Sequence, residues 1–371
     1  MVVAIRAAEV LDVAEPVGVH VGVPFARSVS RPRSQGPAAD ALVWRLRYPM
    51  GKVKPSERGN MGTGIIVIGA SFVDIKGHPH GRYIKAGRNA GKVIEVHGGV
   101  ARNIAEDIAN VGLHPTFLSV VDQGGTSNDI LDRLERQGCD VSHVCRAEDG
   151  LGMWLAVFDH TGDLVASISR RPNLMPLADV LDEVGDEVFS EADAVAIELD
   201  LEAELLERVI ALAERHDKPV FCAVSNMSIA SERRDLLQKV DCLVCNEQEA
   251  EILFSEEFGH ATPDELSERL FEKVRQARID AMVVTLGARG SVYASSDGQR
   301  GVCPPQRATV VDTTGAGDSF FAGVTVGLTY GKGLAEACGI GTRLASSVIA
   351  TKDNVCPRFL PAEFGITVPG A

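Results

Sequence analysis

Short apolar runs and longer amphipathic stretches take turns along the chain from residue 61 onward. Turn residues bound each apolar run, which is typical of a strand buried in a sheet. In the first amphipathic stretch an apolar stripe runs from Val100 to Val111, and Gly112 ends it. The predicted strands cover residues 65–69, 116–120, 194–198, 219–224, 242–245 and 281–286, and the predicted helices cover about 98–111, 128–137, 201–216, 231–239, 247–254, 263–278 and 334–350. This order favours an α/β fold in which helices flank a mostly parallel sheet.

A second pattern, in which polar and apolar residues alternate, marks strands with one exposed face. Residues 92–97 alternate in this way, and residues 154–159 and 164–169 form an expected hairpin around a turn at 160–163. We therefore expect a small sheet apart from the main one, built from segments at about 75–97 and 152–170.

Residues 1–60 follow neither pattern. Pro, Arg, Ser and Gly interrupt short apolar pieces, most densely over residues 28–37, and no sustained period emerges. The segment lacks the clean apolar core of a secretory signal. We expect residues 1–60 to be a disordered or poorly packed extension of one domain at 61–371, with Met61 as an alternative start of the protein.

The composition narrows the classes of partner. The 371 residues carry a net charge of -14 and the sequence pI is about 5.2, so a nucleic-acid partner is not expected. No apolar run reaches the roughly 20 residues that a membrane span needs. With no leader in front of them, the eight cysteines are expected to be reduced thiols of a cytoplasmic protein. Cys242 and Cys245 form a lone C-x-x-C in an expected buried strand, which favours packing thiols over a metal site.

The richest chemistry lies in the run from Asp312 to Gly323, Asp-Thr-Thr-Gly-Ala-Gly-Asp-Ser-Phe-Phe-Ala-Gly. Gly315 and Gly317 let the backbone turn its N–H groups towards one point, in front of a helix expected to begin at Asp318. Such a turn suits a phosphate or a developing phosphoryl group. A carboxylate repels a phosphate, so Asp318 makes sense as a base that takes a proton from an attacking hydroxyl. The alternative is an ordinary first-turn Asp that complements the helix dipole.

The same run resembles the C-terminal signature of the PfkB/ribokinase family of small-molecule kinases. A second block, Gly98-Gly99 followed by Asn103 and then Gly112, resembles the N-terminal signature of that family. The resemblance spans about residues 61–365. It implies a ribokinase-like three-layer sandwich with a mostly parallel central sheet and a small β-sheet lid. It also implies ATP as phosphate donor, Mg2+ as cofactor, and transfer of the γ-phosphate to a hydroxyl of a sugar or nucleoside.

The two blocks and the ends of the expected strands supply the candidate site. Asp74 follows the first strand, at the edge where open α/β sheets place ligands. Asn103 lies off the apolar stripe and can offer its amide to a sugar hydroxyl; the alternative is an ordinary exposed Asn. With the roles that the resemblance adds, Asp318 is the base, the anion hole consists of Gly315, Ala316 and Gly317, and the substrate-binding residues are Asp74, Gly98, Gly99 and Asn103.

Further roles follow from the resemblance on the nucleotide side. It implies that four residues at or after the ends of two expected strands border the nucleotide: Asn246, Thr285, Gly287 and Gly290. It also implies that Glu249 helps to place Mg2+, through water. From spacing alone, Asn246 and Glu249 are equally an Asn cap and a first-turn acid that begin a helix, and both interpretations can hold at once. A monovalent cation such as K+ near Asp312 and Thr314 is a further implication.

Substrate choice rests on finer likeness. Residues 69–77, 88–92 and 98–106 look most like those of pseudouridine kinases, which phosphorylate the 5′-hydroxyl of a C-nucleoside. Phe72 departs from the polar Asn of some members, so ribokinase, fructokinase and other nucleoside kinases remain alternatives. A catalytically silent sugar or nucleoside sensor on the same fold is the hypothesis from another class, and the intact Asp318 argues against it. In the family the lid is often a dimer surface, which implies a homodimer through the small sheet.

Overall fold

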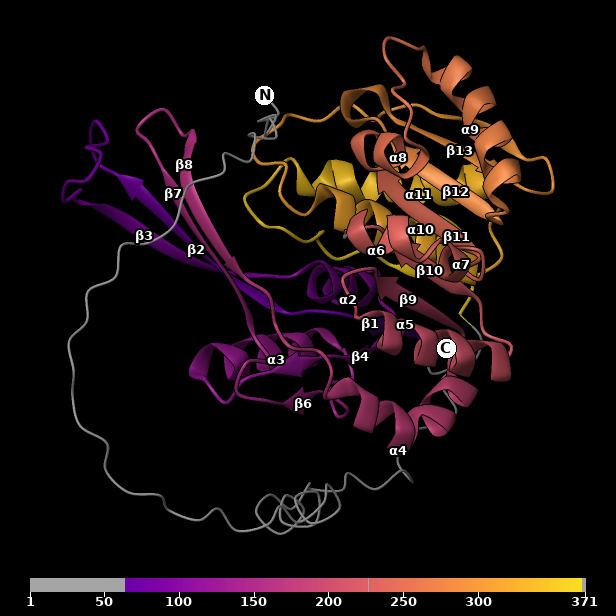
Figure 1. Ribbon diagram of the computed structural model, residues 1–371, viewed down its shortest axis with the longest axis horizontal. Helices are drawn as coiled ribbons and strands as arrows, with labels where there is room; N and C mark the ends of the chain where they lie inside the picture. Colours follow the sequence, from indigo (N-terminus) through magenta and orange to yellow (C-terminus); the bar gives the residue numbers. More distant parts are fainter. Residues whose placement is uncertain (1–63, 226, 369–371) are drawn as a thin grey trace, which may run out of the picture. The chain divides into compact units, whose positions relative to one another are not determined.

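Eight strands form the main sheet of the computed structural model: β1 (Ile65–Ile68), β4 (Thr116–Leu118), β9 (Ala194–Glu198), β10 (Val220–Ala223), β11 (Cys242–Asn246), β12 (Ala281–Thr285), β13 (Ser291–Ser295) and β14 (Arg300–Cys303). Their order is β14-β13-β12-β11-β10-β9-β1-β4 (Figure 1). The pairing is parallel from β4 through β1 to β12, and β13 and β14 add to this edge in antiparallel fashion. The structure describes residues 64–225 and 227–368, within the unit Met61–Ala371. The extension expected at 1–60 lies outside the described residues.

Both faces of this sheet are buried under helices. In β1, Ile65 and Val67 join one hydrophobic core, and Ile66 and Ile68 join the other, because successive strand residues point to opposite faces. The first core is covered by α2 (Val100–Asn110), α3 (Gly125–Gln137), α10 (Ala316–Thr329) and α11 (Leu334–Val348). The second is covered by α4 (Leu177–Glu191), α5 (Ala203–Arg215), α6 (Met227–Glu232), α7 (Arg234–Leu237), α8 (Glu247–Phe254) and α9 (Pro263–Ala277). Burial on both faces explains why these strands are continuous apolar runs.

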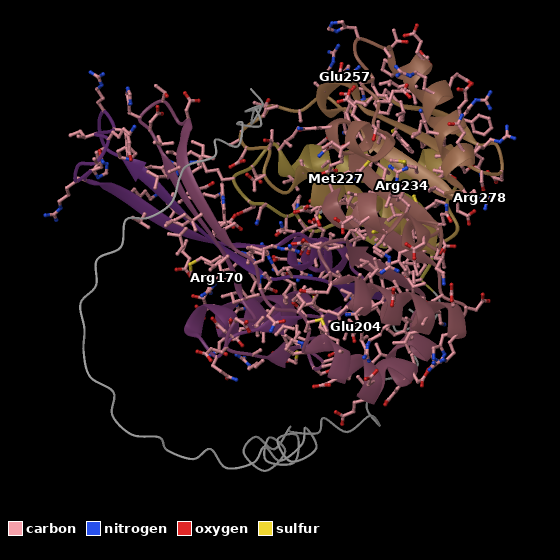
Figure 2. The ribbon with its side chains drawn as sticks, in the orientation of Figure 1. Arg170, Glu204, Met227, Arg234, Glu257 and Arg278 are labelled. Carbon is pink, nitrogen blue, oxygen red and sulfur yellow. The ribbon has the colours of Figure 1, made fainter. Side chains whose placement is uncertain are left out.

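A small sheet of four strands extends from the main body (Figure 1). It consists of β3 (Gly91–Gly98), β2 (Phe72–Pro79), β7 (Gly152–Phe158) and β8 (Leu164–Arg170), in this order. β2 pairs antiparallel with β3 and parallel with β7, and β7 and β8 form the expected hairpin. Arg170, labelled in Figure 2, ends β8 and donates to the Leu151 carbonyl at 3.2 Å, where the sheet meets the body.

Some boundaries differ from the prediction. The single helix expected at 231–239 is wrong: α6 and α7 replace it, because Arg233 leaves helical dihedral angles and pairs with Asp235 and Glu207. α10 begins at Ala316, two residues before Asp318. α4 and β14 were not predicted. The remaining short elements are β5 (Val120–Val121), β6 (Cys145–Arg146) and the 3-10 helices η2 (Gly287–Arg289) and η3 (Pro361–Phe364).

Two further features concern the helices and the cysteines. Among the described residues, the helices are too short or too polar to cross a membrane. The eight cysteines are free, and all except Cys145 are buried. Cys242 and Cys245 therefore pack inside the sheet, as the sequence predicted.

Candidate active site

Asp318 lies in the first turn of α10, and a glycine starts this helix. Gly315 is the N-cap with a φ of 80°, and Asp318 is in the first turn behind it. A Cβ on residue 315 would lie 2.0 Å from the carbonyl oxygen of Asn354. The positive φ and this close approach both exclude a side chain, so the backbone requires a glycine here.

The start of α10 presents free N–H groups on an open side. No side chain caps this helix, and the N–H groups of Gly315, Gly317 and Asp318 have no acceptor among the described residues. Ala316, the other member of the predicted anion hole, donates its N–H to the Thr313 carbonyl at 3.3 Å. A Cβ on Gly317 would meet no atom within 4 Å. Free N–H groups at an open helix start attract an anion.

The carboxylate of Asp318 is held from α2. Asn103 Nδ2 donates to Asp318 Oδ2 at 2.6 Å, and Asn103 Oδ1 accepts from Asn354 Nδ2 at 3.2 Å. Asn103 is buried, so the alternative of an ordinary exposed Asn is wrong, and both ends of its amide are engaged within the protein. Burial raises the pKa of Asp318 to about 6, while the hydrogen bond from Asn103 and the charge of Arg102 oppose the rise. At neutral pH this carboxylate is mostly ionised and still basic enough to take up a proton.

A second link joins the same two helices. Ser319 Oγ donates to Asp107 Oδ2 at 2.6 Å, and the N–H of Cys356 donates to Asp107 Oδ1 at 2.6 Å. Burial raises the pKa of Asp107 to about 7, against these hydrogen bonds. The relative position of α2 and α10 therefore does not depend on the Asn103–Asp318 contact alone.

The start of α2 lies beside the carboxylate of Asp74, a residue of β2. Gly99, its N-cap, has a φ of 100°, and a Cβ there would lie 2.6 Å from the Ala70 carbonyl oxygen. The side chain of Asp74, on β2, reaches over Gly98, where a Cβ would lie 2.9 Å from Asp74 Oδ1. Among the described residues the Asp74 carboxylate has no hydrogen-bond partner, which leaves it available to a ligand.

One buried guanidinium lies near both carboxylates. Burial raises the pKa of Asp74, while the charges of Lys76 and Arg102 oppose the rise; Arg102 acts on Asp318 in the same way. Arg102 is fixed by its own bonds to Glu106 Oε2 at 2.7 Å and to the Gly98 carbonyl at 3.3 Å. The structure thus brings the predicted residues Asp74, Gly98, Asn103 and Asp318 together.

Glu198 is a buried residue of this site that the sequence analysis missed. Its Oε2 accepts from the N–H groups of Ala70 at 3.1 Å and Ala101 at 3.2 Å, so it ties the end of β1 to the start of α2. Burial raises the pKa of Glu198 to about 7. The signal was available: a single acid ends the otherwise apolar predicted strand at 194–198, and a charge at the carboxyl end of a buried strand is a candidate for a site.

On the nucleotide side, the capping interpretation of Asn246 and Glu249 is confirmed. Asn246 Oδ1 accepts from the N–H of Glu249 at 2.9 Å, and Glu249 Oε2 accepts from the N–H of Asn246 at 2.8 Å. Burial raises the pKa of Glu249, against its bonds to Asn246. The Oε1 atom of Glu249 has no partner in the described part of the chain. Its role towards Mg2+ stays a prediction.

Thr285 and the two following glycines form the neighbouring strand end. Thr285 pairs in register with Asn246, so both lie at the same edge of the sheet. Gly287 has a φ of 58° and Gly290 a φ of 88°. A Cβ on Gly290 would lie 2.2 Å from the Cys303 carbonyl oxygen, so this turn requires its glycine.

Asp312 and Thr314 close a small turn in front of α10. Asp312 Oδ1 accepts from the N–H of Thr314 at 2.9 Å and from its hydroxyl at 2.8 Å. Residues 308–311, just before this turn, form no strand, and Val310 and Val311 are exposed. The N–H of Val311 donates to the Ile349 carbonyl at 2.7 Å, which ties the turn to the segment after α11.

A family model, the pfkB family carbohydrate kinases, matches residues 63–356. This range includes all the site residues described above. The chain belongs to this family. A member of it is a kinase that uses ATP and transfers a phosphate group to a hydroxyl of a sugar or nucleoside.

Individual relatives point to sugars and nucleosides. Guanosine-inosine kinase of Exiguobacterium acetylicum is 36% identical over 301 residues, 80% of this chain and 98% of that protein. Pseudouridine kinase of Escherichia coli is 26% identical over 275 residues, 74% of this chain and 86% of that protein. The solved structure of Arabidopsis thaliana ribokinase with ribose and ATP has a TM-score of 0.71 at 20% identity, over 80% of this chain and 96% of that one. This last likeness confirms the ribokinase-like fold.

Proposed function

We propose that this kinase phosphorylates the 5′-hydroxyl of a ribonucleoside, with a purine nucleoside such as guanosine or inosine as the first choice. The relative at 36% identity, 98% of which is covered, is named a guanosine-inosine kinase. Relatives named pseudouridine kinases, at 26% and 22% identity, support the wider class of ribonucleoside acceptors. Pseudouridine, the first choice from the sequence, is therefore the second candidate.

The observation that carries the mechanism is the 2.6 Å contact between Asn103 and Asp318. It holds the start of α10 against α2, and the carboxylate of Asp74 lies beside Gly98 at the start of α2. In the proposed reaction Asp74 binds a hydroxyl of the sugar, and Asp318 takes the proton of the attacking hydroxyl on Oδ1, the oxygen that Asn103 leaves free. The N–H groups of Gly315 and Gly317 stabilise the negative charge on the phosphoryl group.

Mg2+ fits the residues at the nucleotide side as a weakly held partner of ATP. The described residues contain no cluster of three or more His, Cys, Asp or Glu that could hold a metal ion, so ATP oxygens and water would supply most ligands. Glu249 would contribute through water with Oε1, the oxygen that the capping box leaves free. Asn246, Thr285, Gly287 and Gly290 would border the nucleotide. When bound, Mg2+ neutralises charge on the phosphate oxygens.

A monovalent cation near Asp312 and Thr314 is part of the same proposal. The N–H and the hydroxyl of Thr314 both donate to Oδ1 of Asp312, so Oδ2 of Asp312 would bind a cation such as K+. Rates in KCl and NaCl at equal ionic strength test this site. We expect faster turnover in KCl, and equal rates would contradict a K+ site.

A substrate panel tests the proposed function. The full chain is incubated with Mg-ATP and guanosine, inosine, pseudouridine, ribose or fructose, ADP release is measured, and the phosphorylated position is read from the product. We expect kcat/KM for guanosine or inosine to exceed that for ribose at least tenfold, a factor that corresponds to about 1.4 kcal/mol. Faster turnover of ribose or fructose than of every nucleoside would overturn the proposal. A panel with no ADP above the level of Asp318→Asn would favour the silent sensor.

Exposed apolar side chains on one face of the small sheet support a homodimer. Leu155 and Ile168 lie opposite each other on β7 and β8, and Val93 lies on the same face of β3; their exposed fractions are 39%, 70% and 73%. We expect Ile168→Lys to shift the chain from dimer to monomer in light scattering. Leu360→Lys is the matched control, because Leu360 is also exposed, at 66%, but lies outside the small sheet. A monomeric starting protein would contradict the dimer.

A cytoplasmic location completes the proposal. The free and mostly buried thiols support a reducing compartment, and the net charge of -14 argues against a nucleic-acid partner.

A further inference from the structure

Asn354, in the segment after α11, contacts both helices of the site. Its Nδ2 donates to the His97 carbonyl at 2.8 Å and to Asn103 Oδ1 at 3.2 Å. Its own carbonyl oxygen lies against Gly315, at the start of α10. Asn354 is 7% exposed and Asn103 is 4% exposed, so water has little access to replace these bonds.

The donors and acceptors in this set fit together in one direction only. A backbone carbonyl can only accept, so the group of Asn354 that faces His97 must be its NH2. The same NH2 faces Asn103, which must therefore present its oxygen. The NH2 of Asn103 is then left to face Asp318, which accepts as a carboxylate.

Packing alone does not select this orientation of Asn103. The oxygen and NH2 ends of an amide have nearly the same size, so a half-turn of the amide fits the same space. In the turned state the oxygen of Asn103 would face the carboxylate of Asp318, and the bond between them would be lost. Two hydrogen bonds disfavour the turned state: the bond from Asn103 to Asp318 itself and the bond from Asn354 to Asn103.

We propose that Asn354 is a positioning residue for Asp318 and acts through the amide of Asn103. The proposal deepens the proposed function and rests on Asp318 as the base. Asn354 reinforces the orientation in which the NH2 of Asn103 faces the base, and thereby helps to hold Oδ1 of Asp318 towards the attacking hydroxyl and to keep the carboxylate ionised.

Other charged groups also act on Asp318, and Asn354 bonds to none of them. They are Arg102 and Asp107 on α2 and Glu198 at the end of β9. Loss of the Asn354 side chain leaves all three in place. The backbone of the segment also stays fixed, because the N–H of Cys356 donates to Asp107.

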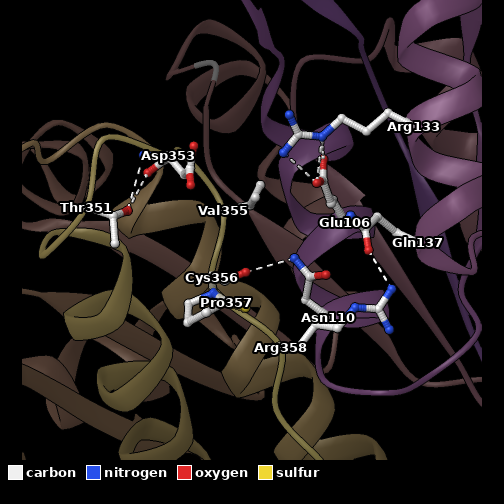
Figure 3. A pocket seen from close by; sticks show the side chains of 10 residues that line it. All are labelled: Glu106, Asn110, Arg133, Gln137, Thr351, Asp353, Val355, Cys356, Pro357 and Arg358. Atoms are coloured by element: carbon white, nitrogen blue, oxygen red, sulfur yellow. Dashed lines mark hydrogen bonds and ion pairs between the residues drawn. The ribbon is translucent and has the colours of Figure 1, made fainter.

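The test compares Asn354→Ala with Asn110→Ala in the full chain. Asn110 is a matched control: it is a buried Asn of α2 whose Nδ2 donates to the Cys356 carbonyl at 2.8 Å (Figure 3). It joins α2 to the same segment, but about two helical turns beyond Asn103. We measure kcat, both KM values and melting temperature, and the pH profile of kcat/KM for the nucleoside that the panel identifies. We expect Asn354→Ala to lower kcat roughly tenfold or more while the KM for ATP stays within about twofold. Its acid limb should move to higher pH by about one unit, because a bond that favours the ionised base is weakened.

Asn110→Ala should lower the melting temperature without moving the acid limb or kcat. Equal effects of the two variants on the pH profile would overturn the proposal, as would a wild-type kcat and acid limb in Asn354→Ala.

Asn103→Asp, which keeps the shape of the side chain, is the second variant if Asn354→Ala does not fold. It places a second carboxylate beside Asp318, so its acid limb should move up further, and an unmoved limb would also overturn the proposal. The variant Asp318→Asn distinguishes failure of the proposed function from failure of this proposal. If Asp318→Asn is active, Asp318 is not the base. If Asp318→Asn is inactive and Asn354→Ala behaves like the wild type, only the positioning role of Asn354 is contradicted.

Discussion

The helices α8 and α10 begin close to the carboxyl edge of the main sheet, but their first turns are built in opposite ways. α8 starts at Asn246, whose side chain accepts from the N–H of Glu249 while Glu249 accepts from the N–H of Asn246. α10 starts at Gly315, has no side-chain cap, and keeps the N–H groups of Gly317 and Asp318 without acceptors in the described part of the chain. Side chains of the first helix start satisfy the N–H groups of Asn246 and Glu249, whereas no side chain caps the second helix start.

This difference separates a helix start that its own side chains cap from one that no side chain caps. An acid in the first turn complements the helix dipole in both cases. At α8 the carboxylate of Glu249 also accepts from the N–H of Asn246, so it stabilises the folded helix start. At α10 the acid is held by Asn103 from another helix, and the backbone donors beside it stay open. Proton and phosphoryl transfer are therefore proposed for the start of α10, where a side chain of another helix holds the acid and no side chain caps the backbone N–H groups.

Replacement of the α10 acid should have the largest effect. We expect Asp318→Asn to lower kcat by several orders of magnitude, because the amide cannot take up the proton of the attacking hydroxyl. Binding of ATP, measured by calorimetry, should change little. A variant with near wild-type activity would remove Asp318 from its role and with it the contrast between the two helix starts.

The two glycines of α10 give the next largest effect and control for each other. Gly315→Ala should lower kcat at least about a hundredfold and destabilise the fold, because its Cβ would lie 2.0 Å from the Asn354 carbonyl oxygen. Gly317→Ala should melt like the wild type, since its Cβ would meet no atom within 4 Å. Loss of activity in Gly317→Ala at unchanged melting temperature would show that a ligand occupies this open side. Similar melting temperatures for both variants would contradict the described turn.

The local parts of this comparison could be predicted from sequence. Short apolar runs located most strands of the main sheet, though not β14, and the glycine-rich run and the Asn-x-x-Glu spacing located the starts of α10 and α8 to within two residues. These features depend on residues that are neighbours in the chain. In β2, by contrast, Gly77 and Pro79 weaken the strand signal, and pairing with both β3 and β7 overrides it.

The contacts that hold the base could not be predicted in this way. Asn103 and Asp318 are 215 positions apart, and Asn103 and Asn354 are 251 positions apart. Their contact depends on how α2, α10 and the segment after α11 pack. For the same reason the sequence analysis expected the Asn103 amide to bind a sugar hydroxyl, whereas in the structure its NH2 bonds to Asp318 and its oxygen bonds to Asn354.

A charge-neutral variant at α8 should have a smaller effect and distinguishes stability from metal placement. Glu249→Gln keeps a capping box, because Gln can also accept from the N-cap N–H, but it removes the charge. We expect an unchanged melting temperature, a several-fold lower kcat, and half-saturation at roughly tenfold more Mg2+. Glu265→Gln in the capping box of α9 is the matched control and should leave activity unchanged. If Glu249→Gln also leaves activity and Mg2+ dependence unchanged, the start of α8 is structural only.

The smallest expected effect concerns the stability of the α10 side, where buried carboxyls accumulate. Burial raises the pKa of Asp107 and Glu198 to about 7 and that of Asp318 to about 6, against ordinary values of 3.8 for Asp and 4.5 for Glu. Between about pH 4 and 7 the folded state therefore binds more protons than the unfolded state at these groups. Their contribution to the free energy of unfolding is present at low pH and is lost as the pH rises through 6 to 7.

Asp107→Asn measures that contribution. An Asn can keep both bonds, since its oxygen accepts from the Cys356 N–H and its NH2 donates to Ser319 Oγ. We expect the wild type to melt a few degrees lower at pH 8 than at pH 6, and Asp107→Asn to lose roughly 2–4 °C of that difference. Asp132→Asn, at an exposed position of α3, should melt with the wild-type pH dependence. A steeper pH dependence in Asp107→Asn than in the wild type would mean that the buried carboxylate is stabilised in its charged form, which would contradict the raised pKa of Asp107.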